Sequence, residues 1–213
     1  MIYPFFKWMK SQKLFKNKVW RNKVKVGVLL DFDGTITKPV FNWPAMKREM
    51  NLTNADLSIL DYISTVDPED AAKIEAILER YEIEAALKAE LNEGAKDLIN
   101  FLREKKIPHA IVTNNAKRHI LKMLEILDLS FEKIITRDIG FWKPDPRQVV
   151  AGAQIIQTPP DRCLFIGDGQ YDMHAATEAG MIAIHLSKSK TLECDYQITS
   201  LNDAIPIISS FYK

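Results

Sequence analysis

Residues 24–37 read VKVGVLLDFDGTIT, and this stretch decides the fold. Valines at alternate positions lead into an uninterrupted apolar run, a pattern typical of a strand that is buried in a sheet. The run stops at Asp31, and Asp33 and Gly34 follow it closely. Ligands of parallel sheets bind beyond the carboxyl ends of the strands, so acidic residues at this position are candidates for a functional site.

After residue 93 the chain alternates between stretches with strand and helix patterns. Strands that alternate with helices of 10–15 residues indicate a parallel, doubly wound sheet of the α/β class. We expect strands at 108–113, 133–136, 162–167, 181–185 and 196–198, and helices at 116–127, 146–157, 170–179 and from about 201.

A helix-rich stretch, roughly residues 42–90, lies between the first strand and this alternating part. Pro44 suits a first helical turn, and Asn54 can cap the helix that follows it. Asp67 and Pro68, followed by two acids, predict the start of a longer helix. That helix places its apolar residues in one stripe.

The composition excludes several classes of protein. With 213 residues, of which 46% are apolar and 27% charged, the chain can build a core and is not disordered. Two cysteines cannot form a disulfide framework, which favours a reducing compartment. No apolar run reaches the roughly 18 residues that a membrane-spanning helix needs. We therefore expect a cytoplasmic protein.

The net charge of +1 is the sum of two opposite parts. Residues 1–25 carry eight basic and no acidic side chains, and the remaining 188 residues carry 21 basic and 28 acidic ones. Residues 1–23 form a basic, aromatic arm, which could lie on an anionic membrane surface or pack on the protein with its lysines in solvent. Organelle targeting is a further alternative. The acidic remainder disfavours nucleic acid as a partner.

Polar side chains follow several of the expected strands, and a parallel topology brings them to one edge of the sheet. Each has a simpler alternative, since Thr113 and Asn114 could cap the next helix and Asp172 suits a first helical turn. Their clustering at successive strand ends favours a functional role. The set comprises Asp31, Asp33, Thr113, Asn114, Lys143, Asp168 and Asp172.

Asp31 and Asp33 lie two residues apart, so in an extended chain their side chains point the same way. An Asx turn that ends the strand is one interpretation. The other is a cation site, because two carboxylates that face one pocket repel each other unless a cation lies between them. Asp168 offers a third oxygen ligand, and a site made only of oxygen ligands favours Mg²⁺ over zinc.

Four motifs, DFDGT, TNN, KPDP and GDGQYD, occur in this order between the expected strands and helices. They resemble the signature motifs of the haloacid dehalogenase-like (HAD) phosphohydrolases, over about residues 24–211. The stretch after the first motif is similar to a phosphoglycolate phosphatase-like subgroup with a short helical cap. The resemblance implies a Rossmann-like core at 24–37 and 93–213 and a small all-helical cap at 38–92, inserted after the first strand.

The resemblance also assigns catalytic roles. Asp31 would be the nucleophile that forms an aspartyl-phosphate, and Asp33 would be the general acid and then the general base. Thr113, Asn114 and Lys143 would bind the phosphoryl group, and Lys143 would also balance charge that develops during catalysis. Such chemistry rests on positioning and on electrostatic stabilisation.

Metal binding follows from the same resemblance. Asp31, the main-chain carbonyl of Asp33 and Asp168 would bind Mg²⁺, with Asp172 supporting from outside the ligand set. The last motif departs from the family pattern, because Gly169 stands where the family usually has serine. This departure removes a hydroxyl near the metal loop and no expected ligand.

These expectations together predict a Mg²⁺-dependent phosphatase that acts on a phosphomonoester of a small metabolite. A sugar-phosphate phosphomutase that uses the same aspartates is an alternative, and a membrane-surface binding module on this scaffold is another. The gap of 82 residues between Asp31 and Thr113 is short for relatives with a full four-helix cap. A smaller lid would exclude water less completely or admit a bulkier substrate.

Other polar and aromatic residues receive structural interpretations. We expect Trp43 and Met46 to be packing residues. The histidines show no metal-ligand spacing and are expected to be structural; they are His109, His119, His174 and His185.

Overall fold

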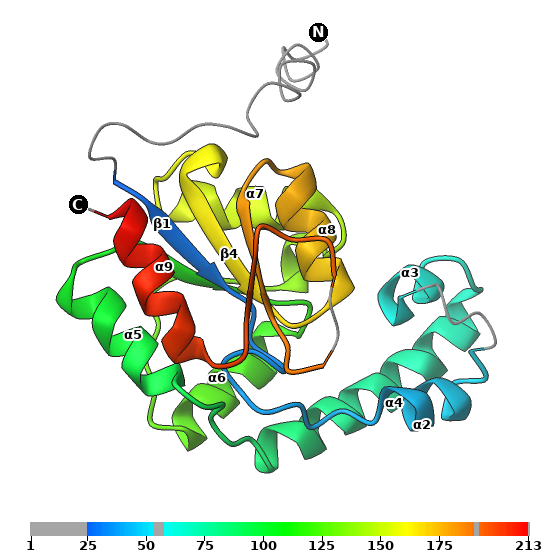
Figure 1. Cartoon of the computed structure of the whole chain (residues 1–213). Coiled ribbons are helices and arrows are strands. Elements are labelled where there is room, and N and C mark those ends of the chain that lie inside the picture. The colour runs from blue at the N-terminus through cyan, green and yellow to red at the C-terminus, as the bar shows by residue number, and fades with distance from the viewer. Residues whose placement is uncertain (1–24, 53–57, 190–191, 213) are drawn as a thin grey trace, which may run out of the picture.

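A computed structural model describes residues 25–52, 58–189 and 192–212. Its centre is a six-stranded parallel sheet with the strand order β3-β2-β1-β4-β5-β6 (Figure 1). The expected doubly wound α/β fold is therefore confirmed. The strands are β1 (Gly27–Leu30), β2 (His109–Val112), β3 (Ile134–Ile135), β4 (Cys163–Gly167), β5 (Ile182–Leu186) and β6 (Tyr196–Ile198).

Helices cover both faces of the sheet, because successive strand residues point to opposite sides. Val28 and Leu30 of β1 pack into one apolar cluster, and Leu29 packs into the other. The first cluster lies under α5 (Ala95–Glu104), α6 (Lys117–Ile126) and α9 (Ala204–Phe211). The second lies under α7 (Pro146–Ile155) and α8 (Gln170–Glu178).

The stretch between β1 and α5 forms a separate helical group, α2 (Trp43–Glu49), α3 (Ile59–Ile63) and α4 (Pro68–Leu87). Figure 1 shows α2 and α3 beside the end of α4 that lies away from the sheet. These helices have an apolar cluster of their own, made of Met46, Met50, Leu52, Ile59, Ile74 and Leu78. We call α2–α4 the helical segment below.

The starts of these helices follow ordinary capping chemistry. Asp67 caps α4 by accepting hydrogen bonds from the backbone N–H groups of Glu69 and Asp70, both at 3.0 Å, as expected. The start of α3 differs from the sequence prediction: the helix begins at Ile59, and its cap is Ser58. The predicted cap, Asn54, lies outside the described residues.

The chain segments that enter and leave the helical segment run side by side. Thr37 forms an isolated bridge with Leu91, and the backbone N–H of Lys38 donates to the carbonyl of Glu90 at 2.9 Å. The ammonium of Lys38 also contacts the Glu90 carboxylate at 2.7 Å. The division into a core and a cap at 38–92 stays a prediction, and these contacts give it a physical basis.

Two expectations concern membranes. None of the described helices combines the length and the apolar character that crossing a bilayer requires. The basic arm at 1–23 lies outside the described residues.

Candidate functional site

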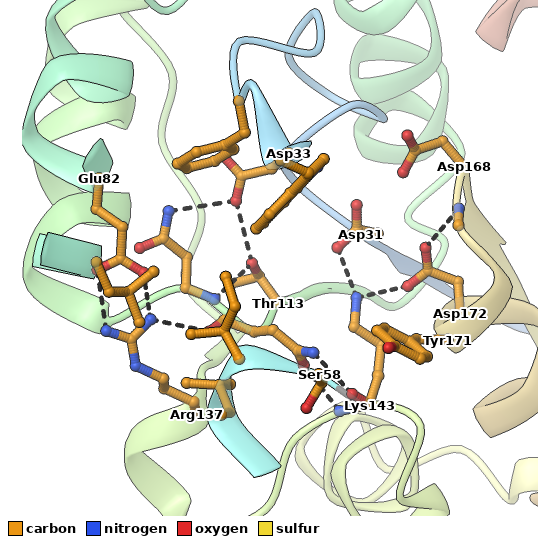
Figure 2. Close-up of a pocket in the computed structure, with 18 of the residues that line it drawn as sticks. Asp31, Asp33, Ser58, Glu82, Thr113, Arg137, Lys143, Asp168, Tyr171 and Asp172 are labelled. Carbon is orange, nitrogen blue, oxygen red and sulfur yellow. Dashed lines mark hydrogen bonds and ion pairs between the residues drawn. The ribbon is translucent and has the colours of Figure 1, made fainter. Parts of the chain in front are cut away.

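A cavity of about 360 Å³ lies between the carboxyl edge of the sheet and the helical segment. All of the strand-end residues singled out in the sequence line this cavity (Figure 2). The parallel topology explains this arrangement, because β1, β2 and β4 are neighbours and their carboxyl ends meet at one edge. The lining residues from this edge are Asp31, Asp33, Thr113, Asn114, Lys143, Asp168 and Asp172.

The turn after β1 depends on Gly34. Its φ angle of +87° lies in the left-handed region, which glycine adopts without strain. A Cβ atom at this position would also lie 2.3 Å from an Asp168 carboxylate oxygen. The carbonyl of Gly34 accepts a hydrogen bond from the Asn92 side chain at 3.1 Å. Glycine thus allows the acidic loop after β1 and the acidic loop after β4 to come together.

Lys143 reaches the end of β1 from the loop before α7. Its ammonium lies 2.5 Å from Asp31 Oδ1 and 2.6 Å from Asp172 Oδ1, and it donates to the carbonyl of Val112 at 3.0 Å. The residue is only 2% exposed. Burial by itself would lower the pKa of Lys143, but the two carboxylates outweigh burial and raise this pKa above its usual value. Lys143 is therefore a fixed positive charge.

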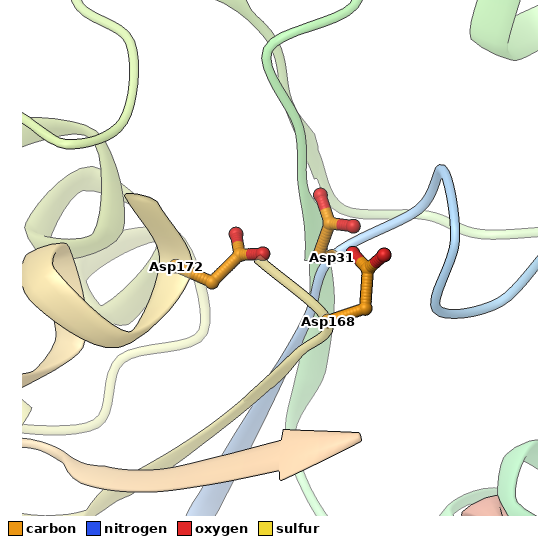
Figure 3. A group of neighbouring side chains, drawn as sticks. All are labelled: Asp31, Asp168 and Asp172. Carbon is orange, nitrogen blue, oxygen red and sulfur yellow. The ribbon is translucent and has the colours of Figure 1, made fainter. Parts of the chain in front are cut away.

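Three carboxylates lie close together at this edge of the sheet, and two of them contact the Lys143 ammonium (Figure 3). Oxygen atoms of Asp31, Asp168 and Asp172 lie within 4.8 Å of one another. Burial raises the pKa of Asp31 well above its usual range, although Lys143 opposes this shift. Burial and the nearby charge of Asp172 raise the pKa of Asp168 to about 7. Three carboxylates against one ammonium leave excess negative charge, and an all-oxygen donor set suits a hard cation such as Mg²⁺.

Glycines let Asp172 fold over the end of β4. A Cβ atom on Gly167 would lie 2.5 Å from the Asp172 Cβ atom, so only glycine fits there without movement. The backbone N–H of Gly169 donates to Asp172 Oδ2 at 3.0 Å. A Cβ atom on Gly169 would lie 3.2 Å from the same oxygen, which is a tight contact. The glycine that replaces the family's usual serine therefore gives this carboxylate room.

The Asp33 carboxylate lies apart from the other three. It accepts hydrogen bonds from Asn115 Nδ2 at 3.2 Å and from Thr113 Oγ1 at 3.5 Å. Burial raises the pKa of Asp33 to about 6. As the residue spacing predicted, Asp31 and Asp33 line one cavity. The three carboxylates whose oxygen atoms lie within 4.8 Å of one another are those of Asp31, Asp168 and Asp172. A pKa near neutrality suits a group that gives and takes a proton.

Asn114 holds the main chain of Lys143. Its Nδ2 donates to the Lys143 carbonyl at 2.8 Å, and its Oδ1 accepts from the Lys143 N–H at 2.7 Å. Gln148 also links Lys143 to the end of β2, because its Oε1 accepts from the Lys143 N–H at 3.2 Å and its Nε2 donates to the Thr113 carbonyl at 2.9 Å. The sequence placed Asn114 on the substrate phosphate, and the structure shows its side chain engaged with the lysine loop. Gln148 gave no signal in the sequence.

The helical segment contacts the sheet edge through buried charge. Glu82 of α4 pairs with Arg137, which lies in the turn after β3, and His119 Nε2 lies 3.4 Å from Glu82 Oε2. Trp142 Nε1 also donates to Asp61 Oδ1 of α3 at 2.7 Å. Sequence reasoning missed these contacts. One signal was available, because Glu82 interrupts the apolar stripe of α4.

The opposite wall of the cavity is mainly apolar. Trp43 stacks on Phe41 with ring centroids 4.8 Å apart, so it makes a packing contact, and it is also half exposed and lines the cavity. Met46 is fully buried, as expected. Ile59, Leu60 and Leu78 add apolar surface to this wall, and Lys47, Ser58 and Glu82 add polar groups.

Comparison with known proteins places the fold and the site in context. A family model described as haloacid dehalogenase-like hydrolase matches residues 48–180. A haloacid dehalogenase-like hydrolase domain-containing protein of Arabidopsis thaliana is 26% identical over 156 residues, which cover 68% of this chain and 64% of that protein. The N-acetylmuramic acid 6-phosphate phosphatase of Pseudomonas putida is 27% identical over 176 residues, which cover 72% of this chain and 78% of that protein.

A phosphoglycolate phosphatase of Pseudomonas putida is 30% identical over 97 residues, which cover 44% of this chain and 36% of that protein. The crystal structure of a hydrolase from Pseudomonas syringae superposes with a TM-score of 0.76 at 21% identity, covering 88% of this chain and 100% of that chain. The structural likeness supports the fold. The family model and the relatives support the family resemblance that the four sequence motifs indicated.

Proposed function

This chain belongs to the haloacid dehalogenase-like hydrolases, and from that premise we propose that it is a Mg²⁺-dependent phosphatase. Its substrate is a phosphomonoester of a small metabolite, and its reaction passes through an aspartyl-phosphate on Asp31. The observation that carries this proposal is the buried contact between Lys143 and Asp31 inside a cavity with space for a ligand. A carboxylate held next to a fixed positive charge suits attack on a phosphoryl group.

The first step forms a bond between an Asp31 carboxylate oxygen and phosphorus and breaks the bond between phosphorus and the leaving-group oxygen. Asp33 donates its proton to that oxygen, and its pKa of about 6 supports this role. In the second step a water oxygen attacks phosphorus, Asp33 takes the proton, and the bond to Asp31 breaks. The products are an alcohol and inorganic phosphate, and Asp31 and Asp33 regain their starting states.

The residues of the carboxylate group fit a divalent cation, which would neutralise phosphoryl oxygens when bound. Asp31, the carbonyl of Asp33 and Asp168 would hold it, and Asp172 keeps Lys143 in place through its 2.6 Å contact. Thr113 and Lys143 would bind phosphoryl oxygens from the other side. Trp43 and Phe41 would contact the leaving group.

A purified Asp31→Asn variant tests the proposal. We expect the wild type to release phosphate from an aryl phosphate only with Mg²⁺, and the variant to lose this activity while it keeps the circular dichroism spectrum of the wild type. A folded variant with full Mg²⁺-dependent hydrolysis would overturn the proposal. Formation of an isomer of a sugar phosphate without phosphate release would favour the phosphomutase alternative.

A further inference from the structure

Glu82 carries a buried charge that the proposed reaction does not use. It lies on α4 of the helical segment, is 2% exposed and lines the cavity. Both of its carboxylate oxygens contact the Arg137 guanidinium, with Nη2 at 2.9 Å from Oε2. Burying two opposite charges away from water carries a large desolvation penalty, so such a pair calls for an explanation beyond stability.

Arg137 connects this pair to the lysine loop. Its Nη1 also donates to the Asn114 carbonyl at 3.0 Å. The side chain of Asn114 in turn holds the main chain of Lys143 at both its N–H and its carbonyl. Lys143 ends on Asp31 at 2.5 Å. Hydrogen bonds and ion pairs therefore connect α4 to the main chain of Lys143, and the side chain of Lys143 leads on to the proposed nucleophile (Figure 2).

We propose that Glu82 is a positioning residue, which through Arg137 and Asn114 holds the Lys143 ammonium beside Asp31. This inference rests on the proposed phosphatase function. Lys143 stabilises charge that develops during phosphoryl transfer, so a loosened lysine lowers kcat more than it raises KM. The helical segment then acts on the chemical step itself, in addition to covering the cavity.

If the role of Glu82 were purely structural, breaking another ion pair at the same interface would have the same effect on kcat. The chain offers such a pair as a matched control. Arg118 of α6 and Glu79 of α4 form a second ion pair between the helical segment and the sheet layer, at 3.0 Å. Both side chains are about half exposed, and the contacts above that lead to Lys143 do not include them. Breaking this pair weakens the same interface and leaves the lysine loop untouched.

The experiment compares Glu82→Gln, Arg137→Met, the double variant and Glu79→Gln. We expect the first two to lower kcat about 10- to 100-fold, the range for residues that orient a catalytic group, with KM changed less than about threefold. Glu79→Gln should keep the wild-type kcat. The double variant has no unpaired buried charge, so its thermal midpoint should recover toward the wild type while kcat stays low.

Hydrogen exchange supplies a readout that does not depend on activity. The backbone N–H of Lys143 donates to Asn114 Oδ1 at 2.7 Å and, at the longer distance of 3.2 Å, to Gln148 Oε1. If Glu82 holds Asn114 in place, peptides covering residues 140–145 should exchange faster in Glu82→Gln than in Glu79→Gln. A wild type without phosphatase activity would contradict the proposed function, and the exchange result would still test the link from Glu82 to Lys143. Unchanged exchange, an unchanged kcat in Glu82→Gln, or a kcat that recovers with stability in the double variant would overturn this inference.

Discussion

Two groups of largely buried charged residues line the same cavity and differ in the balance of positive and negative charge. In the first, the Lys143 ammonium contacts Asp31 and Asp172, and the Asp168 carboxylate lies close to both of these acids. Around Arg137, one guanidinium faces the single carboxylate of Glu82. Like charges that are buried together repel one another unless an ion of opposite charge binds, whereas the charges of a matched pair neutralise each other. We infer that the first group takes up a cation and the second holds two parts of the chain together.

Replacing Lys143 by Met disturbs the unbalanced group most strongly. Asp31 and Asp172 then lose the ammonium that contacts both of them, and the group of three carboxylates loses its positive charge. We expect activity to fall by about 10²–10³-fold, as for loss of one group that stabilises developing charge. The free energy of unfolding of the metal-free protein should fall by about 3–5 kcal/mol, the usual effect of removing one partner of a buried ion pair.

Hydrolysis of an aryl phosphate and urea unfolding measure these two effects. Lys188→Met is a suitable control, because Lys188 is largely exposed and contacts Glu93 at 3.4 Å on the surface. Its expected change in stability is within about 0.5 kcal/mol. A Lys143→Met variant with wild-type activity would show that the unbalanced group is not the catalytic one.

Replacing Trp43 by Ala tests the apolar wall, which belongs to neither charge group. Loss of aromatic contact with the leaving group should cost about 0.5–1.5 kcal/mol, which is roughly a 2- to 12-fold rise in KM for an aryl phosphate. We expect kcat to change less than about twofold and inhibition by inorganic phosphate to stay the same. Equal losses in kcat and in phosphate affinity would mean that Trp43 acts on the charged groups.

Replacing His119, which lies 3.4 Å from Glu82, gives the smallest expected effect. It tests how a neutral histidine beside the Glu82–Arg137 pair affects the pH dependence of stability. Burial lowers the pKa of His119, although Glu82 opposes this shift, so the folded protein keeps this histidine neutral to lower pH than the unfolded chain does. Stability from this residue is present above the unfolded pKa of about 6.5 and is lost as the pH falls toward the folded pKa. Urea unfolding at pH 7.5 and pH 5.5 should show a weaker pH dependence in His119→Gln than in the wild type. Identical dependences would mean that His119 does not titrate differently on folding.

The sequence predicted the sheet and the location of the site well, for a physical reason. Apolar runs such as the one before Asp31 mark buried strands, and helices between them force a parallel order. Parallel order brings the strand ends together, so residues as distant as Asp31 and Lys143 could be placed at one edge without any knowledge of their contacts.

The direction of individual side chains could not be predicted in the same way. Spacing placed Asp31 and Asp33 at one cavity, but it did not show that Asn115 and Thr113 donate hydrogen bonds to the Asp33 carboxylate. The pairing of Glu82 with Arg137 depends on how the helical segment lies over the sheet, which local patterns do not specify. An acidic residue such as Glu82 on the apolar face of a helix predicts that a buried partner exists, but it does not identify that partner.

Thermal unfolding of Asp168→Asn and Glu82→Gln, with and without Mg²⁺, separates the two groups by the sign of the effect. In metal-free protein, Asp168→Asn removes one carboxylate from the group with excess negative charge, so we predict a higher midpoint, whereas Glu82→Gln should lower it. Mg²⁺ should raise the midpoint of the wild type, since a ligand at 100 times its Kd stabilises by about 2.7 kcal/mol, and should have little effect on Asp168→Asn. A lower metal-free midpoint for Asp168→Asn, with equal stabilisation of variant and wild type by Mg²⁺, would contradict a cation site at these carboxylates.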